Sequence, residues 1–333
     1  MLDSDLDHLI QEKGFVDLQV DSNLDLVAAI NDLKRAKNAV ILGHFYITPE
    51  LQDISDYIGD SLGLSQNAAQ TEADIIVFLG VHFMAETAKI LNPDKKVIIP
   101  DVKASCSLAE SAPAGKFADF LKKYPGYKVI SYINCTADIK ALSDVICTSS
   151  NAVKIVESFS KDEKLIFAPD KNLGNYINGL TGRDMVLWDG ACMVHEKYSL
   201  EKILELKQQN PGSKFIAHPE CEKPLLLVAD FIGSTTALLK YTQRDDSHCY
   251  IVATESGILH QMKKSSPLKE FIPAPSTDAN CACNDCSYMK LNTLQKLYWA
   301  LKFEKPEVTL STGIMDKARK PILKMLEISA PLK

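Results

Sequence analysis

The feature that most constrains the fold of this chain is an internal repeat. Residues Pro125–Asn134 (PGYKVISYIN) line up with residues Pro211–Glu220 (PGSKFIAHPE), at an offset of 86 residues from position 125 to position 211. The same offset carries Cys106 onto Cys192, and a looser copy of the apolar run ends at His44. Three modules of similar length, each with one apolar run and one cysteine, predict three similar domains within one chain.

Within each module, short apolar runs alternate with helical patterns. In the first module we expect strands over residues 38–44, 75–81 and 96–101, and a helix over residues 85–91. The segment from Thr48, followed by Pro49 and Glu50, is typical of a helix start. That helix would carry Leu51, Ile54 and Ile58 on one face and end near Gly59. Strands that alternate with helices at these lengths indicate parallel sheets with crossover helices.

We therefore predict an α/β fold of three small three-layer domains with parallel sheets, related by pseudo-threefold symmetry. The expected boundaries are 1–112, 113–195 and 196–303, with a C-terminal helix over 304–333 that packs back on the first domain. Because parallel sheets bind ligands at the carboxyl ends of their strands, the active site is expected where these ends converge.

Polar residues follow the predicted strands of all three modules. Hydroxyl and amide groups at a strand-to-helix turn bind carboxylate or phosphate, which predicts an anionic small molecule as ligand. Glu220 lies two residues after His218 on the same strand end, so both side chains point the same way, and Glu220 is the best candidate for a general acid or base. The strand-end candidates are His44, Tyr46, Tyr132, Asn134, Thr148, Ser149, His218, Glu220, Ser234 and Thr235.

The nine cysteines predict a metal centre. Cys281, Cys283 and Cys286 form a C-x-C-x-x-C run, but no second C-x-x-C or His-x-His pair completes the usual zinc pattern, and the run is not that of a ferredoxin. One thiolate from each module would instead hold three corners of a [4Fe–4S] cluster and leave its fourth iron open as a Lewis acid. Cys135, Cys147, Cys221 and Cys249 lie in or beside apolar strands and are expected to be buried, inert thiols.

Composition narrows the class of protein and its compartment. The net charge of −6 and the lack of basic runs argue against nucleic-acid binding. The acidic N-terminus is unlike a signal peptide, and the longest apolar runs are too short to cross a bilayer. An odd number of cysteines without a leader is typical of a reducing compartment, so we expect a cytoplasmic protein without membrane contacts.

The chain also resembles a known protein family, over roughly residues 25–325. The chain closely resembles the quinolinate synthases, which make quinolinate for NAD biosynthesis from iminoaspartate and dihydroxyacetone phosphate. The motifs that carry the resemblance are HFYITPELQD from His44, GDSL from Gly59, FMAETAKIL from Phe83, SYIN from Ser131, TSSNAVKIV from Thr148, GACMVHE from Gly190, HPEC from His218, ADFIGST from Ala229, ATESGILH from Ala253 and CSYMKLN from Cys286.

The resemblance implies three α/β domains in a pseudo-threefold array and one [4Fe–4S] cluster with a vacant iron. It implies Cys106, Cys192 and Cys286 as the ligands, with Cys281 and Cys283 as additional thiols available for redox chemistry.

For the substrates, the resemblance implies that Ser61, Ser149, Ser234 and Thr235 hold phosphate and carboxylates. His44, Tyr46 and His218 would position or protonate oxygens, Glu220 would move protons, and His195 would reach the substrate beside the cluster. L-aspartate oxidase, which makes iminoaspartate, is the expected functional neighbour.

Two interpretations from other classes remain compatible with the residues. A zinc-stabilised dicarboxylate-binding protein would use the same strand-end anion site and would be colourless. A dithiol oxidoreductase built on the C-x-C-x-x-C run would turn over without metal. Neither explains why Cys106 and Cys192 keep the register of the repeat.

Overall fold

The computed structural model describes residues 3–277 and 285–330 of the 333-residue chain. Cys281 and Cys283 lie outside the described residues. Contacts divide the chain into two compact units, which are described separately below: Met1–Cys106 with Ser287–Arg319, and Ser107–Cys286 with Lys320–Lys333.

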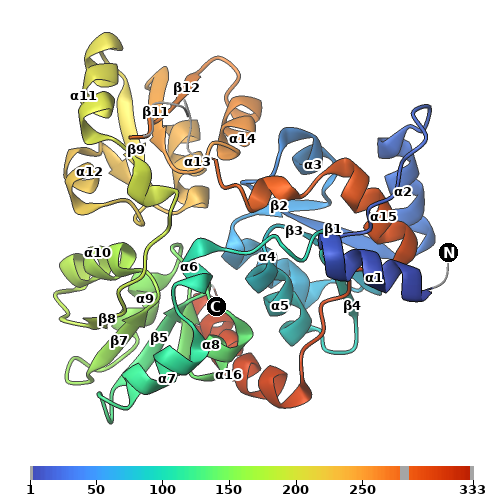
Figure 1. Ribbon diagram of the computed structural model, residues 1–333. Helices are drawn as coiled ribbons and strands as arrows, with labels where there is room; N and C mark the ends of the chain where they lie inside the picture. Colours follow the sequence, from blue (N-terminus) through green and yellow to red (C-terminus); the bar gives the residue numbers. More distant parts are fainter. Residues whose placement is uncertain (1–2, 278–284, 331–333) are drawn as a thin grey trace. The chain divides into compact units, whose positions relative to one another are not determined.

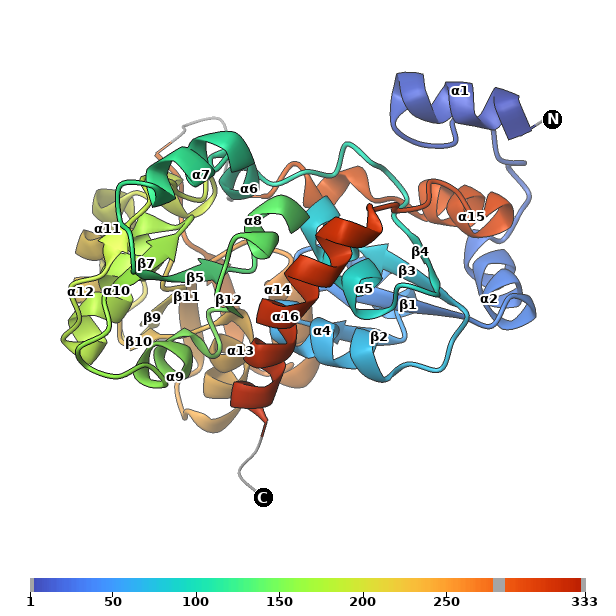
Figure 2. The same cartoon turned by 90° about the horizontal axis from the view of Figure 1, so that it is seen from below.

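The first unit is built on one four-stranded parallel sheet in the order β2-β1-β3-β4. Helices α4 and α5 pack along its strands, α2 and α3 pack against β1, and α15 packs on α2 (Figures 1 and 2). Because helices cover the sheet, β3 is apolar and buried at every position. The elements are α1 Asp3–Lys13, α2 Leu26–Ala36, β1 Ala39–His44, α3 Pro49–Ile54, β2 Tyr57–Gly59, α4 Ser61–Gln70, β3 Ile75–Leu79, α5 His82–Leu91, β4 Lys96–Ile98, η2 Met289–Leu291 and α15 Leu294–Phe303.

The second unit contains two further four-stranded parallel sheets, in the orders β6-β5-β7-β8 and β10-β9-β11-β12. The elements around the first of them are α6 Ser107–Glu110, α7 Ala114–Leu121, β5 Lys128–Tyr132, α8 Ala137–Ala141, β6 Val145–Cys147, α9 Ala152–Glu157, β7 Leu165–Ala168, α10 Lys171–Thr181, β8 Val186–Leu187 and η1 His195–Lys197. Those around the second are α11 Leu200–Gln209, β9 Lys214–Ala217, α12 Lys223–Val228, β10 Phe231–Ile232, α13 Thr235–Arg244, β11 Cys249–Ala253, α14 Ile258–Ser265 and β12 Glu270–Pro273.

All three sheets share one strand order, in which the second strand of the module lies at the edge beside the first. The prediction of three parallel α/β modules is therefore confirmed. Their pseudo-threefold arrangement and the boundaries 1–112, 113–195 and 196–303 stay predictions.

An aspartate fixes the edge strand in the same way in each module. The Asp56 amide donates to the Ile41 carbonyl, and the Asp56 carboxylate accepts the Ile41 amide at 2.8 Å. Asp144 makes the same pair of bonds with Val129, and Asp230 makes it with Phe215. A lysine pairs with each aspartate: Lys34, Lys128 and Lys207. The repeat seen in the sequence thus extends to equivalent backbone contacts.

One local expectation is wrong. The helix that begins after Thr48 ends at Ile54, and Ile58 belongs to strand β2 rather than to the helix. The reason is the double hydrogen bond of Asp56 with β1, which turns the chain into the sheet edge one residue after the cap at Ser55.

The C-terminal segment is divided between the two units, and each part hydrogen-bonds within its own unit. Pro306 and Val308 hydrogen-bond to the β4 region of the first unit, through Ile99 and Val97. Helix α16 (Thr312–Ser329) contains the division between the units, and its last residue, Ser329, accepts a hydrogen bond from Asn151 of the second unit at 2.8 Å. Among the described helices, none is long and apolar enough to cross a membrane.

Candidate active site

The candidate site begins at the carboxyl end of β9, where His218 and Glu220 follow the strand. The Glu220 amide donates to His218 Nδ1 at 3.4 Å. An accepting Nδ1 leaves the proton of a neutral imidazole on Nε2, which lies 3.1 Å from the Ser149 hydroxyl. The strand end therefore places His218 with its Nε2 facing the hydroxyl of a neighbouring module.

A second imidazole, His195, lies against the first. The two rings stack with their centroids 4.8 Å apart. His195 Nδ1 lies 2.8 Å from Glu220 Oε2, and Nε2 lies 3.1 Å from the Thr254 hydroxyl at the end of β11. All three charged or titratable side chains are about 2% exposed, so they interact in a low-dielectric setting.

The electrostatics of Glu220 are set by these neighbours. Burial opposes ionisation, but His195 and His218 together outweigh it, and the pKa of Glu220 falls to about 2. The hydroxyl of Tyr132, at the end of β5, adds a hydrogen bond to the same carboxylate. Glu220 is thus held as an ionised carboxylate by its neighbours.

Hydroxyl groups gather beside this cluster. Ser234 caps α13 by accepting the Ala237 amide at 3.3 Å, and its hydroxyl also accepts a hydrogen bond from Ser150 at 2.8 Å. Thr235, the first residue of α13, is 3% exposed. The positive end of a ten-residue helix and these hydroxyls form a setting that favours an anion.

Cys192, His195 and Glu220 form a possible metal-binding group, because their ligand atoms lie within 4.8 Å of one another. Cys286 contacts the carboxyl end of β11, because its amide donates to Glu255 Oε1 at 3.2 Å and Glu255 follows Thr254 in the chain. Both cysteines are partly exposed, whereas Cys135, Cys147 and Cys221 are buried. Burial raises the pKa of Cys147 and Cys221 well above the usual thiol range, in keeping with inert thiols.

Three of the predicted substrate-site residues lie in the first unit, as does the predicted ligand Cys106. His44 ends β1, and its ring lies edge-on to Tyr46 with the centroids 4.5 Å apart. The Tyr46 amide donates to His44 Nδ1 at 3.3 Å, as the Glu220 amide does to His218. Ser61 is the first residue of α4. The strand ends of the two units therefore share one local geometry.

The structure joins part of the predicted site by direct contacts. Asn134 lies two residues beyond β5, and its Oδ1 is buried with no hydrogen-bond partner among the described residues. Cys106 belongs to the first unit and is partly exposed. Besides the contact of His44 with Tyr46 in the first unit, the predicted residues that the described contacts join are those of the second unit: Tyr132, Ser149, Cys192, His195, His218 and Glu220.

Comparison with known proteins decides the family. A family model described as Quinolinate synthetase A protein matches residues 28–327. The chain belongs to this family. The quinolinate synthase of Thermosynechococcus vestitus is 61% identical over 306 residues, which covers 92% of this chain and 96% of the relative. That of Synechocystis sp. strain PCC 6803 is 61% identical over 305 residues, with the same coverage. The prediction of an enzyme of this family is confirmed.

Sequence reasoning missed several residues of the site in this family member. The Thr254 hydroxyl contacts His195, and Glu255 accepts a hydrogen bond from the Cys286 amide. The Ser150 hydroxyl donates to Ser234. A signal for the first two was available, because the polar residues Thr254 and Glu255 directly follow the apolar run Cys249–Ala253, as His218 directly follows β9. Ser150 gave no signal, since a serine in a strand-to-helix turn is common.

Proposed function

We propose that this protein is a quinolinate synthase that condenses iminoaspartate with dihydroxyacetone phosphate to give quinolinate, phosphate and two waters. The observation that carries the proposal is the buried His195–Glu220–His218 cluster beside Cys192, in a chain that belongs to the quinolinate synthetase family. A buried carboxylate between two imidazoles suits a reaction with several proton transfers.

The metal centre is proposed to be a [4Fe–4S] cluster on Cys106, Cys192 and Cys286. The contacts of the second unit fit this donor set. The Cys286 amide bonds to Glu255, the neighbouring Thr254 hydroxyl lies 3.1 Å from His195, and a ligand atom of His195 lies within 4.8 Å of the Cys192 thiol. Ser107, which follows Cys106 in the chain, accepts the Met193 amide beside Cys192 at 3.3 Å. When bound, a cluster with three thiolate ligands supplies an open iron that acts as a Lewis acid in dehydration.

The protein's own side chains would carry the remaining steps. Ser149, Ser234 and Thr235, with Ser61, would hold the phosphate and carboxylates through hydroxyl and helix-start donors. Glu220 would take a proton from substrate carbon or nitrogen, and His195 would stabilise its charge from 2.8 Å.

In the same scheme, His218 would donate its Nε2 proton, and His44 and Tyr46 would position oxygens during enolisation and phosphate loss. The cytoplasmic location and the functional link to L-aspartate oxidase belong to this proposal.

The test is iron, acid-labile sulfide and activity on protein purified without oxygen. We expect about four iron and four sulfide per chain, and quinolinate from the two substrates. Cys286→Ser should lose both, and Cys249→Ser is the matched control, because Cys249 is also partly exposed but lies at the opposite end of β11 from Thr254.

Cys283→Ser is also expected to keep cluster and activity. Zinc in place of iron, with no turnover, would support a dicarboxylate-binding protein instead. Turnover by metal-free protein would support a dithiol oxidoreductase.

A further inference from the structure

A second buried carboxyl, that of Asp170, interacts electrostatically with Glu220. Asp170 stands two residues beyond the end of β7 and is the N-cap of α10, where its Oδ1 accepts the Leu173 amide at 2.8 Å. Its side chain is fully buried. Bonds from the Lys171 amide to the Gly190 carbonyl, at 2.8 Å, fix the backbone at this position.

The other oxygen of Asp170 has no such partner. Oδ2 is buried and completes no hydrogen bond with any residue that the structure describes. The nearest cation in sequence, Lys171, is engaged with Asp189 at 3.0 Å and Glu196 at 3.7 Å. A buried carboxylate that has no cation beside it and one oxygen without a hydrogen bond is costly, whereas a neutral carboxyl in the same place costs far less.

Asp170 also interacts electrostatically with the candidate site. Strand β7 pairs with β5, whose last residue, Tyr132, hydrogen-bonds to Glu220. Burial, and then the nearby Glu220 charge, raise the pKa of Asp170 well above its ordinary value, although the Leu173 and Asn172 amides oppose this. The titratable groups around it are Lys171, His195, Glu196, His218, Glu220 and Cys221.

The surroundings therefore stabilise the ionised form of Glu220 more strongly than that of Asp170. Glu220 has two imidazoles and a phenol to stabilise its ionised form, and Asp170 has backbone amides at one oxygen. When like charges share a buried site, one group ionises and the other keeps its proton.

We propose that Asp170 is a positioning residue that acts through Glu220: it stays a neutral carboxylic acid, so that Glu220 is the single charged member of the buried carboxyl pair. The inference rests on the proposed role of Glu220 in proton transfer. A second charge here would repel the carboxylates and phosphate of the proposed substrates and would draw His195 or His218 away from Glu220.

The first measurement is the infrared spectrum of the holoprotein, with and without the substitution Asp170→Asn. Wild-type protein should show the carbonyl band of a protonated carboxylic acid at neutral pH, and Asp170→Asn should lose that band. Asn is as good an N-cap as Asp, so α10 should keep its start. Asp25→Asn is the control, since Asp25 caps α2 in the same way through the Ala28 amide but is exposed.

The second measurement is stability against pH. Above the ordinary pKa of 3.8, the folded wild type keeps a proton on Asp170 that the unfolded chain has lost, so its stability falls as the pH rises. Asp170→Asn lacks this penalty, and its melting temperature should gain on the wild type as the pH increases. In the pH profile of kcat/KM, the wild type should lose activity at alkaline pH as Asp170 ionises, and Asp170→Asn should lack this decline.

A wild-type spectrum without a protonated-acid band, or a melting-temperature difference that does not change with pH, would overturn the proposal. Neither readout needs turnover. A protein with the band but without quinolinate synthesis would therefore refute the proposed function while it leaves the protonation of Asp170 established.

Discussion

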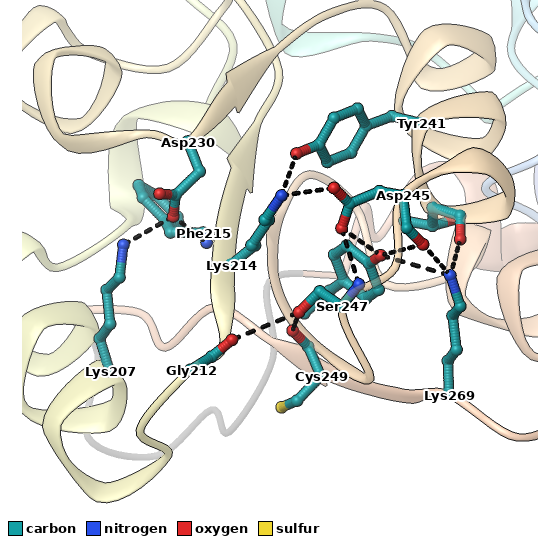
Figure 3. Close-up of polar contacts among 12 residues, drawn as sticks. Lys207, Gly212, Lys214, Phe215, Asp230, Tyr241, Asp245, Ser247, Cys249 and Lys269 are labelled. Carbon is teal, nitrogen blue, oxygen red and sulfur yellow. Dashed lines mark hydrogen bonds and ion pairs between the residues drawn. The ribbon is translucent and has the colours of Figure 1, made fainter.

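The two ends of strands β9 and β11 carry polar clusters of different character. At the amino ends, Lys214 pairs with Asp245 and donates to the Tyr241 hydroxyl at 3.0 Å, and Tyr250 donates to Asp245 Oδ1 at 2.8 Å (Figure 3). Lys269 completes the group with a bond to the Thr242 carbonyl at 2.7 Å. At the carboxyl ends lie His218, Glu220 and Thr254, as described above.

The difference lies in how the charges are balanced. At the amino ends, burial opposes the charge on Asp245, but Lys214 and Tyr250 hold the pKa of Asp245 well below its usual range. Burial and the same carboxylate raise the pKa of Tyr250. These groups keep one protonation state over the physiological range. The carboxyl ends instead bring two imidazoles to a buried carboxylate, and the imidazoles outweigh the burial and keep that carboxylate ionised.

The comparison indicates why a parallel sheet places structure at one edge and chemistry at the other. Loops at the carboxyl ends lead into helix starts, which supply N–H donors and a positive dipole for ligands. The amino ends receive helix C-termini and offer no such donors. The predictions below test this division.

The largest effect is expected at Glu220. Glu220→Gln keeps the shape of the side chain but removes the base, so quinolinate formation should fall by about 10²-fold or more. Iron content should stay unchanged. A variant that keeps wild-type turnover would remove Glu220 from the chemistry.

The matched change at the opposite edge is Asp245→Ala. It removes acceptors from Tyr250 and from the Ser247 amide, and the free energy of unfolding should fall by about 2 kcal/mol. Because its pair with Lys214 is partly exposed, that pair adds little. Urea denaturation measures the loss, and kcat at a temperature below unfolding should stay near that of the wild type. A large loss of kcat in folded protein would break the division between the edges.

The same aspartate predicts a pH dependence. Since the folded pKa of Asp245 is depressed, its stabilisation is present above the ordinary value of 3.8 and is lost as the pH falls through the folded value. The difference in stability between wild type and Asp245→Asn should therefore shrink in acid. Melting curves at a series of acidic pH values check this, and a constant difference would contradict it.

A smaller effect is expected at Thr254. Thr254→Val keeps the shape but removes the hydroxyl 3.1 Å from His195 Nε2, so the imidazole loses one of its two fixed contacts. Turnover should fall about tenfold, which corresponds to roughly 1.4 kcal/mol. Thr242→Val, a buried threonine on α13 outside the site, is the control. Equal losses in both variants would point to packing rather than to the imidazole.

The smallest effect is expected from Tyr250→Phe, which removes one hydroxyl from the polar cluster at the amino ends of β9 and β11. The cost in unfolding free energy should be about 1 kcal/mol, measured by urea denaturation with Tyr241→Phe alongside. The Tyr241 hydroxyl accepts a hydrogen bond from Lys214, but none of the bonds given above joins it to Asp245. Tyr241→Phe should therefore lose less unfolding free energy than Tyr250→Phe. A larger loss for Tyr241→Phe would mean that the bond of Tyr241 with Lys214 stabilises the fold more than the bond of Tyr250 with Asp245.

Much of this molecule follows from local sequence patterns. Strands over 39–44, 75–79 and 96–98, the repeat, and the pairing of His218 with Glu220 on one strand end all follow from apolar periodicity and from residue spacing. The register of the repeat pointed to Cys106 and Cys192, and the family motif from Cys286 pointed to the third cysteine. Such features depend on neighbours within a few residues, which a sequence displays directly.

The tertiary structure decided what depends on distant neighbours. Strand β2 replaced a helical turn because Asp56 bonds to β1, and Ser150 met Ser234 from 84 positions away. The charge states of Asp170 and Glu220 likewise depend on burial and on imidazoles from other segments. Spacing determines which side chains stand at a strand end, but only the packing of separate segments sets the dielectric and the partners that decide their protonation.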